Sequence, residues 1–421
     1  MNKCVFIFLL PIHLLAQSFS NQSFNDSIKT VFLTSNGSTS ITRPSNNTNE
    51  YQLPVIKMNQ AHALTLHFDL LSNEYMEHSY TLVHCNPDWT PSDLFSNEYL
   101  NGYTEDNILN FKYSQNTSQN YIHYSQSFPD DNMVITKSGN YVILVYPVGQ
   151  RNKVVLCQKF YVVKKNVSIT PLPSSSLSDH KSVHQINFKI NQSSINSSDP
   201  RSEFKVAVLK NQNYNNLQFY LPTYINGNLL SYNSSKMNIE AGNEFRQFDT
   251  RNINLGTNGY GVYKSLFQDN QYHSILHPSK IRSYGTYSSV ADHNGFQYIQ
   301  SQKSRSAYSE TDYTWVYFYL NHPTADSTLN IYVWGALTNW EKKSEAKMTF
   351  NKKSKQYVGT LFLKQGVHDF AYLTDKKGKL NWSTIEGSYY ETDNYYSVLV
   401  YHKSFTSNYY ELVGVKSFTY N

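Results

Sequence analysis

The sequence contains little cysteine and little charge, and it lacks the short motifs that identify common catalytic and metal sites. Its 421 residues include three cysteines, and charged residues make up 16% of the chain. It has no CxxC or HExxH spacing, no Walker loop, no dinucleotide fingerprint and no nucleophile elbow. We therefore expect no metal site, no cofactor and no enzymatic activity.

Basic residues are not clustered, and a single long apolar run occurs in the sequence. The formal net charge is +5, and its even spread argues against a nucleic-acid partner. The apolar run, Val5–Ala16, follows Lys3 and is too short to span a bilayer. These features predict a secretory signal peptide over residues 1–20, cleaved after Ala16 or Ser20, and a soluble protein in an exported compartment.

Aromatic residues are abundant, and the pattern of apolar residues favours strands. Tyr alone occurs 36 times, and no stretch keeps the 3.6-residue apolar period of a helix. Strand-sized apolar runs bounded by Gly, Asn and Ser predict an all-β fold. We expect three consecutive immunoglobulin-like β-sandwich domains. They cover residues 28–165 (N-terminal), 166–309 (middle, β-rich) and 310–421 (C-terminal).

Two strand patterns in the first domain predict which faces are buried. Leu64–Leu70 alternates apolar and polar residues, so we expect a half-buried strand with His67 and Asp69 facing water. Tyr141–Tyr146 is apolar on both faces, and this pattern is typical of a central strand.

The segment Tyr80–Trp89, YTLVHCNPDW, combines more unusual residue types than any other. It begins as a strand, in which Tyr80, Leu82 and His84 face one side and their neighbours face the other. Pro87 ends the strand pairing because it has no N–H to donate. We expect a strand-to-loop corner, with Trp89 anchoring the loop that follows.

Two cysteines, Cys85 and Cys157, remain after removal of the signal peptide. Both lie in strand-like segments, and an oxidising compartment would permit a disulfide between them. The sequence leaves open whether they pair. A shared metal is excluded for His84 and Cys85, because adjacent residues of a strand face opposite sides.

The segment Gly242–Asn252 places Glu244, Arg246, Asp249 and Arg251 close together. The simpler interpretation is a network of ion pairs that holds a strand. A carboxylate site is the alternative, but no second catalytic partner is positioned by the sequence. We therefore favour the ion-pair network.

Three tryptophans of the C-terminal domain offer an alternative function. The strand running into Gly335–Trp340, followed by a Gly turn and a Phe/Tyr strand, resembles starch-binding and glycogen-branching β-sandwich modules. Trp334, Trp340 and Trp382 could then stack on sugar rings. The simpler expectation, which we favour, is that they are core and corner residues.

The order of several segments resembles the first domain of the type IX secretion system plug proteins of Bacteroidota. The matching segments are VIKMN, LTLHFDL, YTLVHCNPDW, EYLNGY, NYIHYSQSFP, SGNYVILVY and FYVV. The resemblance continues in order through HQINFKI, NEFRQFD, DHNG, TDYTWVYFY, LKQG and EGSYYETDNYY. The blocks HCNPDW–EYLNGY and NEFR–FD are the specific ones. In one segment, Lys210–Asn216, the chain departs from the family by having Tyr214 and asparagines.

The resemblance implies a role in protein secretion that involves no catalysed reaction. Proteins similar to this one lie in the periplasm, at the inner face of the outer membrane. There they occlude a large outer-membrane translocon β-barrel until cargo is engaged. The implied partner is that barrel, bound through a displaceable interface rich in aromatic residues. A glycan-binding module and an enzyme fragment with an unseen site remain the alternatives.

Overall fold

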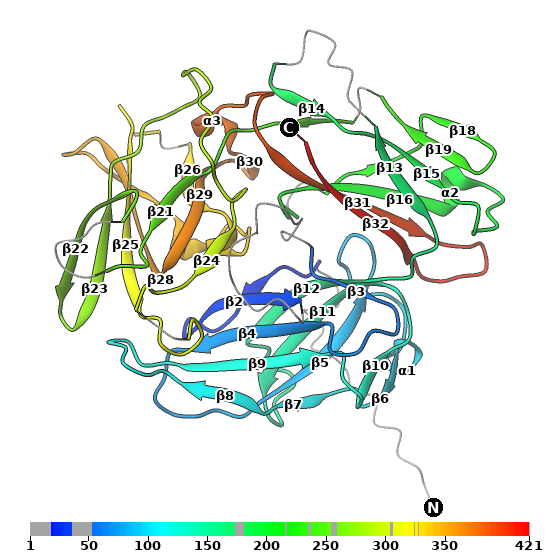
Figure 1. Ribbon diagram of the computed structural model, residues 1–421, viewed down its shortest axis with the longest axis horizontal. Coiled ribbons are helices and arrows are strands. Elements are labelled where there is room, and N and C mark those ends of the chain that lie inside the picture. The colour runs from blue at the N-terminus through cyan, green and yellow to red at the C-terminus, as the bar shows by residue number, and fades with distance from the viewer. Residues whose placement is uncertain are drawn as a thin grey trace, which may run out of the picture.

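The computed structural model describes residues 18–35, 53–172, 181–214, 217–234, 237–253, 259–303, 306–323, 325–326 and 328–420. Residues 1–17 of the predicted signal peptide, including Cys4, lie outside these ranges. The described chain is nearly all β, as predicted, and its α-helices have four residues each. None of these described helices is long and apolar enough to cross a membrane. The strand pairing groups the chain into three units (Figure 1).

Unit 1, residues 18–166, is a sandwich of two sheets around one core. The first sheet contains β1 (Gln22–Ser23), β12 (Leu156–Val163), β11 (Gly139–Pro147), β5 (His78–Cys85) and β7 (Asp106–Ile108), with β3 (Val55–Lys57) beside β12. The second contains β2 (Ile28–Ser35), β4 (Leu64–Leu70), β9 (Ile122–Phe128) and β8 (Asn110–Tyr113). A ribbon of β6 (Leu100–Gly102) and β10 (Met133–Ile135) follows α1 (Ser96–Tyr99).

Unit 2 is discontinuous and consists of residues 167–241 and 394–420. Its first sheet contains β13 (Ser168–Leu172), β15 (Asn187–Asn191), β19 (Leu229–Tyr232) and β18 (Tyr224–Asn226). Its second contains β17 (Phe219–Tyr220), β16 (Phe204–Lys210), β31 (Asn394–His402) and β32 (Glu411–Tyr420). The pair β14 (Val183–Gln185) and β20 (Asn238–Glu240), and α2 (Pro200–Glu203), complete the unit. In Figure 1 the two red C-terminal strands therefore lie among green ones.

Unit 3, residues 242–393, is inserted between β20 and β31. One sheet contains β21 (Arg246–Asp249), β29 (Gly366–Lys376), β24 (Gln297–Ile299), β26 (Asn330–Trp334) and β30 (Lys379–Asn381). The other contains β22 (Val262–Gln268), β23 (Gln271–Leu276), β25 (Tyr313–Asn321), β28 (Gln356–Lys364) and β27 (Thr349–Asn351). Three short helical segments connect strands: η2 (Ala336–Thr338), η3 (Ser344–Ala346) and α3 (Ser383–Glu386).

The strand pairing corrects the predicted boundary between residues 309 and 310. The expected middle domain, 166–309, supplies β21 to β24 to the sheets of unit 3. The expected C-terminal domain, 310–421, returns β31 and β32 to unit 2, where β31 pairs with β16 over seven residue pairs. Local patterns predict strands but carry no information about partners so distant in sequence. The N-terminal domain is expected at residues 28–165, and unit 1 spans residues 18–166.

The outer face of β4 corrects a second expectation. Leu64, Leu66 and Phe68 pack in the core of unit 1, as predicted. His67 and Asp69, expected to face water, are 6% and 0% exposed. Residues of unit 3 cover this face. The alternating pattern therefore predicts which face of β4 packs in the core of unit 1, but it does not show that the other face contacts another unit.

A second apolar cluster lies between units 1 and 2. It combines Val83, Val142 and Tyr161 of unit 1 with Leu399 and Leu412 of unit 2, all buried. The central strands of unit 1 are thus covered on both faces, as the pattern of Tyr141–Tyr146 predicts. Burial of this kind is the main favourable term in domain association. Units 1 and 2 are therefore held by a shared core.

Candidate functional site

The corner at the end of β5 has the geometry expected from Asn86 and Pro87. The Trp89 N–H donates to the Asn86 carbonyl at 2.9 Å, and the Asn86 N–H donates to the Thr90 carbonyl at 2.8 Å. Trp89 has a φ of 68°, an uncommon value for a bulky residue, and its side chain is 2% exposed. The corner turns the indole inward and so anchors the loop, as predicted.

The Trp89 ring lies at the junction of units 1 and 2. It contacts Tyr161 and, from unit 2, Tyr214, with ring centroids 5.1 and 5.7 Å apart. The buried Lys159 ammonium lies 4.9 Å from the centroids of the Trp89 and Tyr214 rings. Tyr214 belongs to the segment Lys210–Asn216, in which the resemblance implies a departure from the family pattern. This segment therefore contributes to a contact between units.

One buried side chain connects this corner to unit 2. The Asn140 amide donates to the carbonyls of Asn86 and Pro87, both at 3.2 Å. Its oxygen accepts a hydrogen bond from the Tyr401 hydroxyl of unit 2 at 2.8 Å. The HCNPDW block thus takes part in the contact between units 1 and 2, and its role is structural.

Cys85 and Cys157 are free thiols in the structure, and both are buried. Cys85 lies opposite Asn140 and Cys157 opposite Leu144, on either side of β11. Two strand spacings and four residues of offset separate their Cα atoms by about 16 Å, beyond the ~7 Å that a disulfide allows. The pairing that the sequence leaves open is not formed. Burial raises the pKa of the Cys85 thiol, which disfavours the reactive thiolate.

A buried charged network connects unit 1 to unit 3. The Asp69 carboxylate accepts hydrogen bonds from Lys364 Nζ and the Tyr313 hydroxyl, both at 2.7 Å, and lies 2.6 Å from His123 Nδ1. Tyr313 also contacts the Thr30 hydroxyl at 2.6 Å. Lys364 is 2% exposed and Asp69 is fully buried. The polar face of β4 therefore binds β25 and β28.

The pKa values in this network follow from burial and from the partners. Burial alone would raise the pKa of Asp69, but Lys364 and His123 outweigh burial and hold it below its ordinary value. Burial lowers the pKa of His67 to about 3, so this ring is neutral near pH 7. A buried ion pair loses much stability when one partner is removed. The network is therefore a specific connection between the units.

The three tryptophans proposed to stack on sugar rings are buried, which corrects that alternative. Trp334, Trp340 and Trp382 are 3%, 4% and 8% exposed. They pack around Phe245 in one cluster, and the Trp334 indole donates to the Trp340 carbonyl at 3.0 Å. Lys210 of unit 2 lies 4.5 Å from the Trp382 ring. No aromatic platform for a glycan is formed by these residues.

The NEFRQFD and EGSYY segments meet in an ion-pair network, as the simpler interpretation of Gly242–Asn252 predicts. Arg246 Nη2 lies 2.9 Å and Arg282 Nη2 lies 2.7 Å from Glu386 Oε2. Glu386 is fully buried. Burial alone would raise the pKa of Glu386, but the two guanidinium groups hold it below its ordinary value. The sequence could not identify Arg282 and Glu386 as partners.

Two further carboxyl groups, absent from our sequence-based candidates, lie close together. Burial and the neighbouring Asp369 raise the pKa of Asp292 well above its ordinary value. Asp292 accepts hydrogen bonds from the backbone N–H groups of Phe245 and Asn294, and Asp369 accepts one from that of His293. These backbone contacts give the pair a role in fixing the DHNG turn. Across the described ranges, no group of three or more His, Cys, Asp or Glu could hold a metal ion.

An exposed apolar patch lies at the edge of unit 1, on β8 and the preceding loops. We call Tyr75, Met76, Leu109, Phe111 and Tyr113 the β8 patch; these side chains are between 38% and 73% exposed. The Tyr75 and Phe111 rings lie 4.4 Å apart, and the Phe111 and Tyr113 rings 5.8 Å apart. β8 is also an edge strand of its sheet. Exposed apolar patches and unpaired edges are typical of interaction surfaces.

Comparison with known proteins finds a family match over the first domain and a close structural match over the whole chain. Residues 28–164 match the family described as "Type 9 secretion system plug protein 1st domain". A crystal structure of a hypothetical protein from Parabacteroides merdae ATCC 43184 is 28% identical, with a TM-score of 0.88. The alignment covers 96% of this chain and 100% of that chain. The discontinuous arrangement of units is therefore similar to that of a protein solved by experiment.

Two further structures match only weakly. The ICAM-5 D1–D4 ectodomain fragment is 8% identical, with coverage of 93% of this chain and 98% of that chain and a TM-score of 0.12. The collagen adhesin from S. aureus is 8% identical, with coverage of 93% and 91% and a TM-score of 0.11. Neither carries an inference about this chain. No curated protein matches the chain.

Proposed function

We propose that this chain is a plug, because residues 28–164 match the family described as "Type 9 secretion system plug protein 1st domain". In this proposal it is exported to the periplasm and closes the pore of the outer-membrane translocon barrel. It acts by steric occlusion and has no catalytic role. Its partner is the barrel, and its association with the membrane is through the barrel.

The observation that carries the proposal is the connection of all three units by buried contacts. Units 1 and 2 share the apolar cluster around Trp89 and Tyr401. Units 1 and 3 share the buried Asp69–Lys364 ion pair. A body that closes a pore must keep its shape under contact with the rim, and a chain of loosely linked sandwiches would not. Buried interfaces of this kind support such a rigid body.

The β8 patch is the surface that we assign to the barrel contact. Aromatic side chains dominate the energy of protein interfaces because they bury a large area with few rotatable bonds. The patch lies at the outer edge of the second sheet of unit 1 (Figure 1), and its side chains are exposed although the Gln115 N–H, just beyond β8, donates to the Ser309 carbonyl of unit 3 at 2.8 Å. Its modest number of side chains suits an interface that cargo displaces.

Affinity purification of the tagged protein from its own cell envelope tests the proposal. We expect a large outer-membrane barrel protein in the eluate. The double variant Phe111→Ser/Tyr113→Ser should lose this partner. The matched control, Tyr263→Ser/Phe267→Ser, alters exposed aromatics of another edge strand, β22, and should retain it. An eluate without any barrel protein would contradict the proposal. Equal recovery of the barrel with both double variants would show that the β8 patch is not the contact surface.

A further inference from the structure

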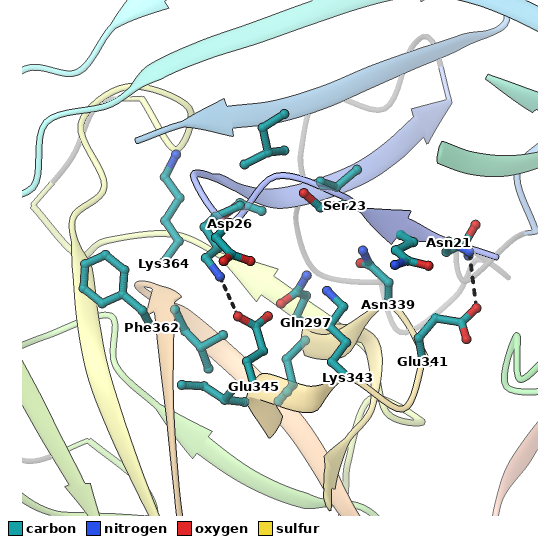
Figure 2. A pocket seen from close by; sticks show the side chains of 18 of the residues that line it. Asn21, Ser23, Asp26, Gln297, Asn339, Glu341, Lys343, Glu345, Phe362 and Lys364 are labelled. Atoms are coloured by element: carbon teal, nitrogen blue, oxygen red, sulfur yellow. Dashed lines mark hydrogen bonds and ion pairs between the residues drawn. The ribbon is translucent and has the colours of Figure 1, made fainter. Parts of the chain in front are cut away.

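A pocket of about 410 Å³ lies between units 1 and 3. One wall is the segment from Ser20 to Val31, which contains β1 and β2. The other wall is formed by β24, by the segment from Leu337 to Glu345, and by the end of β28. Figure 2 shows polar side chains from both walls pointing into this space. The volume lies in the range of small-molecule sites, about 300–1,000 Å³.

Contacts between the units cross the pocket at two places. Lys29 Nζ lies 2.7 Å from Glu345 Oε2, and the Asn21 N–H donates to Glu341 Oε1 at 3.2 Å (Figure 2). Lys364, which also lines the pocket, is paired with Asp69. Most charged groups of the lining thus have partners within the protein, and they fix the two walls relative to each other.

Besides the Asp26 carboxylate and the Ser344 hydroxyl, three further polar side chains of the pocket have no such partner. Within the described ranges, no hydrogen bond or ion pair is formed by the ammonium of Lys343 or by the side-chain amides of Gln297 and Asn339. All three line the pocket and lie near one another in Figure 2. Burial lowers the pKa of Lys343, although the neighbouring Glu345 partly opposes this effect. The Glu345 and Glu341 carboxylates act on this ammonium at a distance, but none of its three N–H donors is used in a hydrogen bond to a described residue, so they are free to bind an anionic partner.

We propose that this pocket binds a small oxyanion-bearing ligand, a carboxylate or a phosphate, with Lys343 as the charged contact. Gln297 and Asn339 supply amide N–H donors to the same oxygens. The carboxyl group of Asp26 at the rim is exposed, so solvent screens its charge. A ligand held here contacts both units and stabilises their contact. Binding of such a ligand does not depend on the proposed plug function.

Calorimetric titration of the full chain with citrate, inorganic phosphate and glucose 6-phosphate, at constant ionic strength, tests the site. We expect saturable binding of at least one probe. Citrate alone would assign the ligand to carboxylates, and the two phosphate probes alone would assign it to phosphates. Lys343→Met should weaken binding about ten- to hundred-fold, the loss of one charge-assisted hydrogen bond. The control Lys352→Met, on the exposed turn after β27, should bind as the parent does.

The result that overturns the inference is the absence of saturable binding by every probe, or equal binding by the parent and Lys343→Met. If Lys343→Met does not fold, Gln297→Leu provides the same comparison, because it removes an amide without removing a charge. Its binding should then be weaker than that of the parent. Unchanged binding by Gln297→Leu would equally overturn the assignment of this pocket.

Discussion

At the residue scale, Trp89 connects the HCNPDW segment to the packing of the molecule. Its indole is 2% exposed and contacts Tyr161 of its own unit and Tyr214 of unit 2. Lys159 lies against both the Trp89 and Tyr214 rings. The turn formed by Asn86 and Pro87 places this side chain between units 1 and 2. A contact between units is thus built from a strand-to-loop turn.

Replacement of this side chain should be costly. Trp89→Ala should lower the free energy of unfolding by about 3–5 kcal/mol, because it removes a buried aromatic ring and leaves a cavity. Chemical denaturation of the parent and the variant measures this loss. The control Phe95→Ala, at a site 77% exposed, should change stability by no more than about 0.5 kcal/mol. A Trp89→Ala protein as stable as the parent but unable to bind the translocon would instead identify this corner as a contact surface.

At the element scale, β4 connects two units. Its apolar residues pack in the core of unit 1, and its polar residues bind β25 and β28 of unit 3. The Asp69–Lys364 pair is fully desolvated, so each charge depends on the other. The strand is therefore buried on both faces, although its sequence alternates.

The coupling between Asp69 and Lys364 can be measured with a double-mutant cycle. Asp69→Asn and Lys364→Met should each destabilise the protein by about 3–5 kcal/mol, since each removes one member of a buried ion pair and leaves the charge of the other without its counter-ion. The double variant should be less destabilised than the sum of the two, because it buries no lone charge. Strictly additive losses would show that the pair contributes no coupling.

The sequence predicts the elements of this fold better than their partners. Pro87 and the alternation in Tyr80–Cys85 are local features, and they identify the corner and the two faces of β5 correctly. The burial of His67 and Asp69 depends on Lys364, which lies in another unit. A polar residue facing a second unit has the same sequence pattern as one facing water. The network could therefore not be predicted from the sequence.

The same limit applies to the ion-pair and tryptophan clusters. Arg246 was predicted to belong to a structural ion-pair network, and it does, but its partner Glu386 comes from a distant helix. The sequence predicts Trp334 to be a core or corner residue, and its ring packs with Trp382 and Phe245 in one buried cluster. In both cases the residue type predicts the kind of contact, but the sequence does not identify the residue on the other side of it. The carboxyl pair of Asp292 and Asp369 gave no local signal at all.

At the scale of the whole molecule, buried histidines make stability depend on pH. Burial lowers the pKa of several rings: to about 3 for His67, and to about 4 for His78, His84, His184 and His368. These values lie below the ~6.5 of an unfolded histidine. The folded state therefore binds fewer protons than the unfolded state between about pH 6.5 and pH 4. The free energy of unfolding should be highest above about pH 6.5 and should decrease as the pH falls from there to about pH 4.

Urea unfolding at a series of pH values checks this expectation. The midpoint should fall steadily between about pH 6.5 and pH 4. His84→Gln should flatten part of this fall, because His84 is buried. The control His277→Gln, at an exposed site, should leave the profile unchanged. A midpoint that is constant or rises on acidification contradicts the assignment of these rings as neutral.

The insertion of unit 3 into unit 2 gives the molecule its shape. The chain enters unit 3 after β20 and returns through β31, so two chain crossings join these units. Together with the shared apolar cluster of units 1 and 2, these crossings restrict relative motion of the units. The sequence could not predict the insertion, because β16 and β31 are separated by the whole of unit 3. The rigidity that supports the plug proposal is thus a property of the topology.

The most direct test of this account is the ionic conductance of the purified translocon barrel in a planar bilayer. Addition of the full chain to the periplasmic side should close the pore, and the Phe111→Ser/Tyr113→Ser variant should close it less well. The Tyr263→Ser/Phe267→Ser variant should act as the parent does. Unchanged conductance with the parent chain bound to the barrel would contradict the account, since binding would then occur without occlusion.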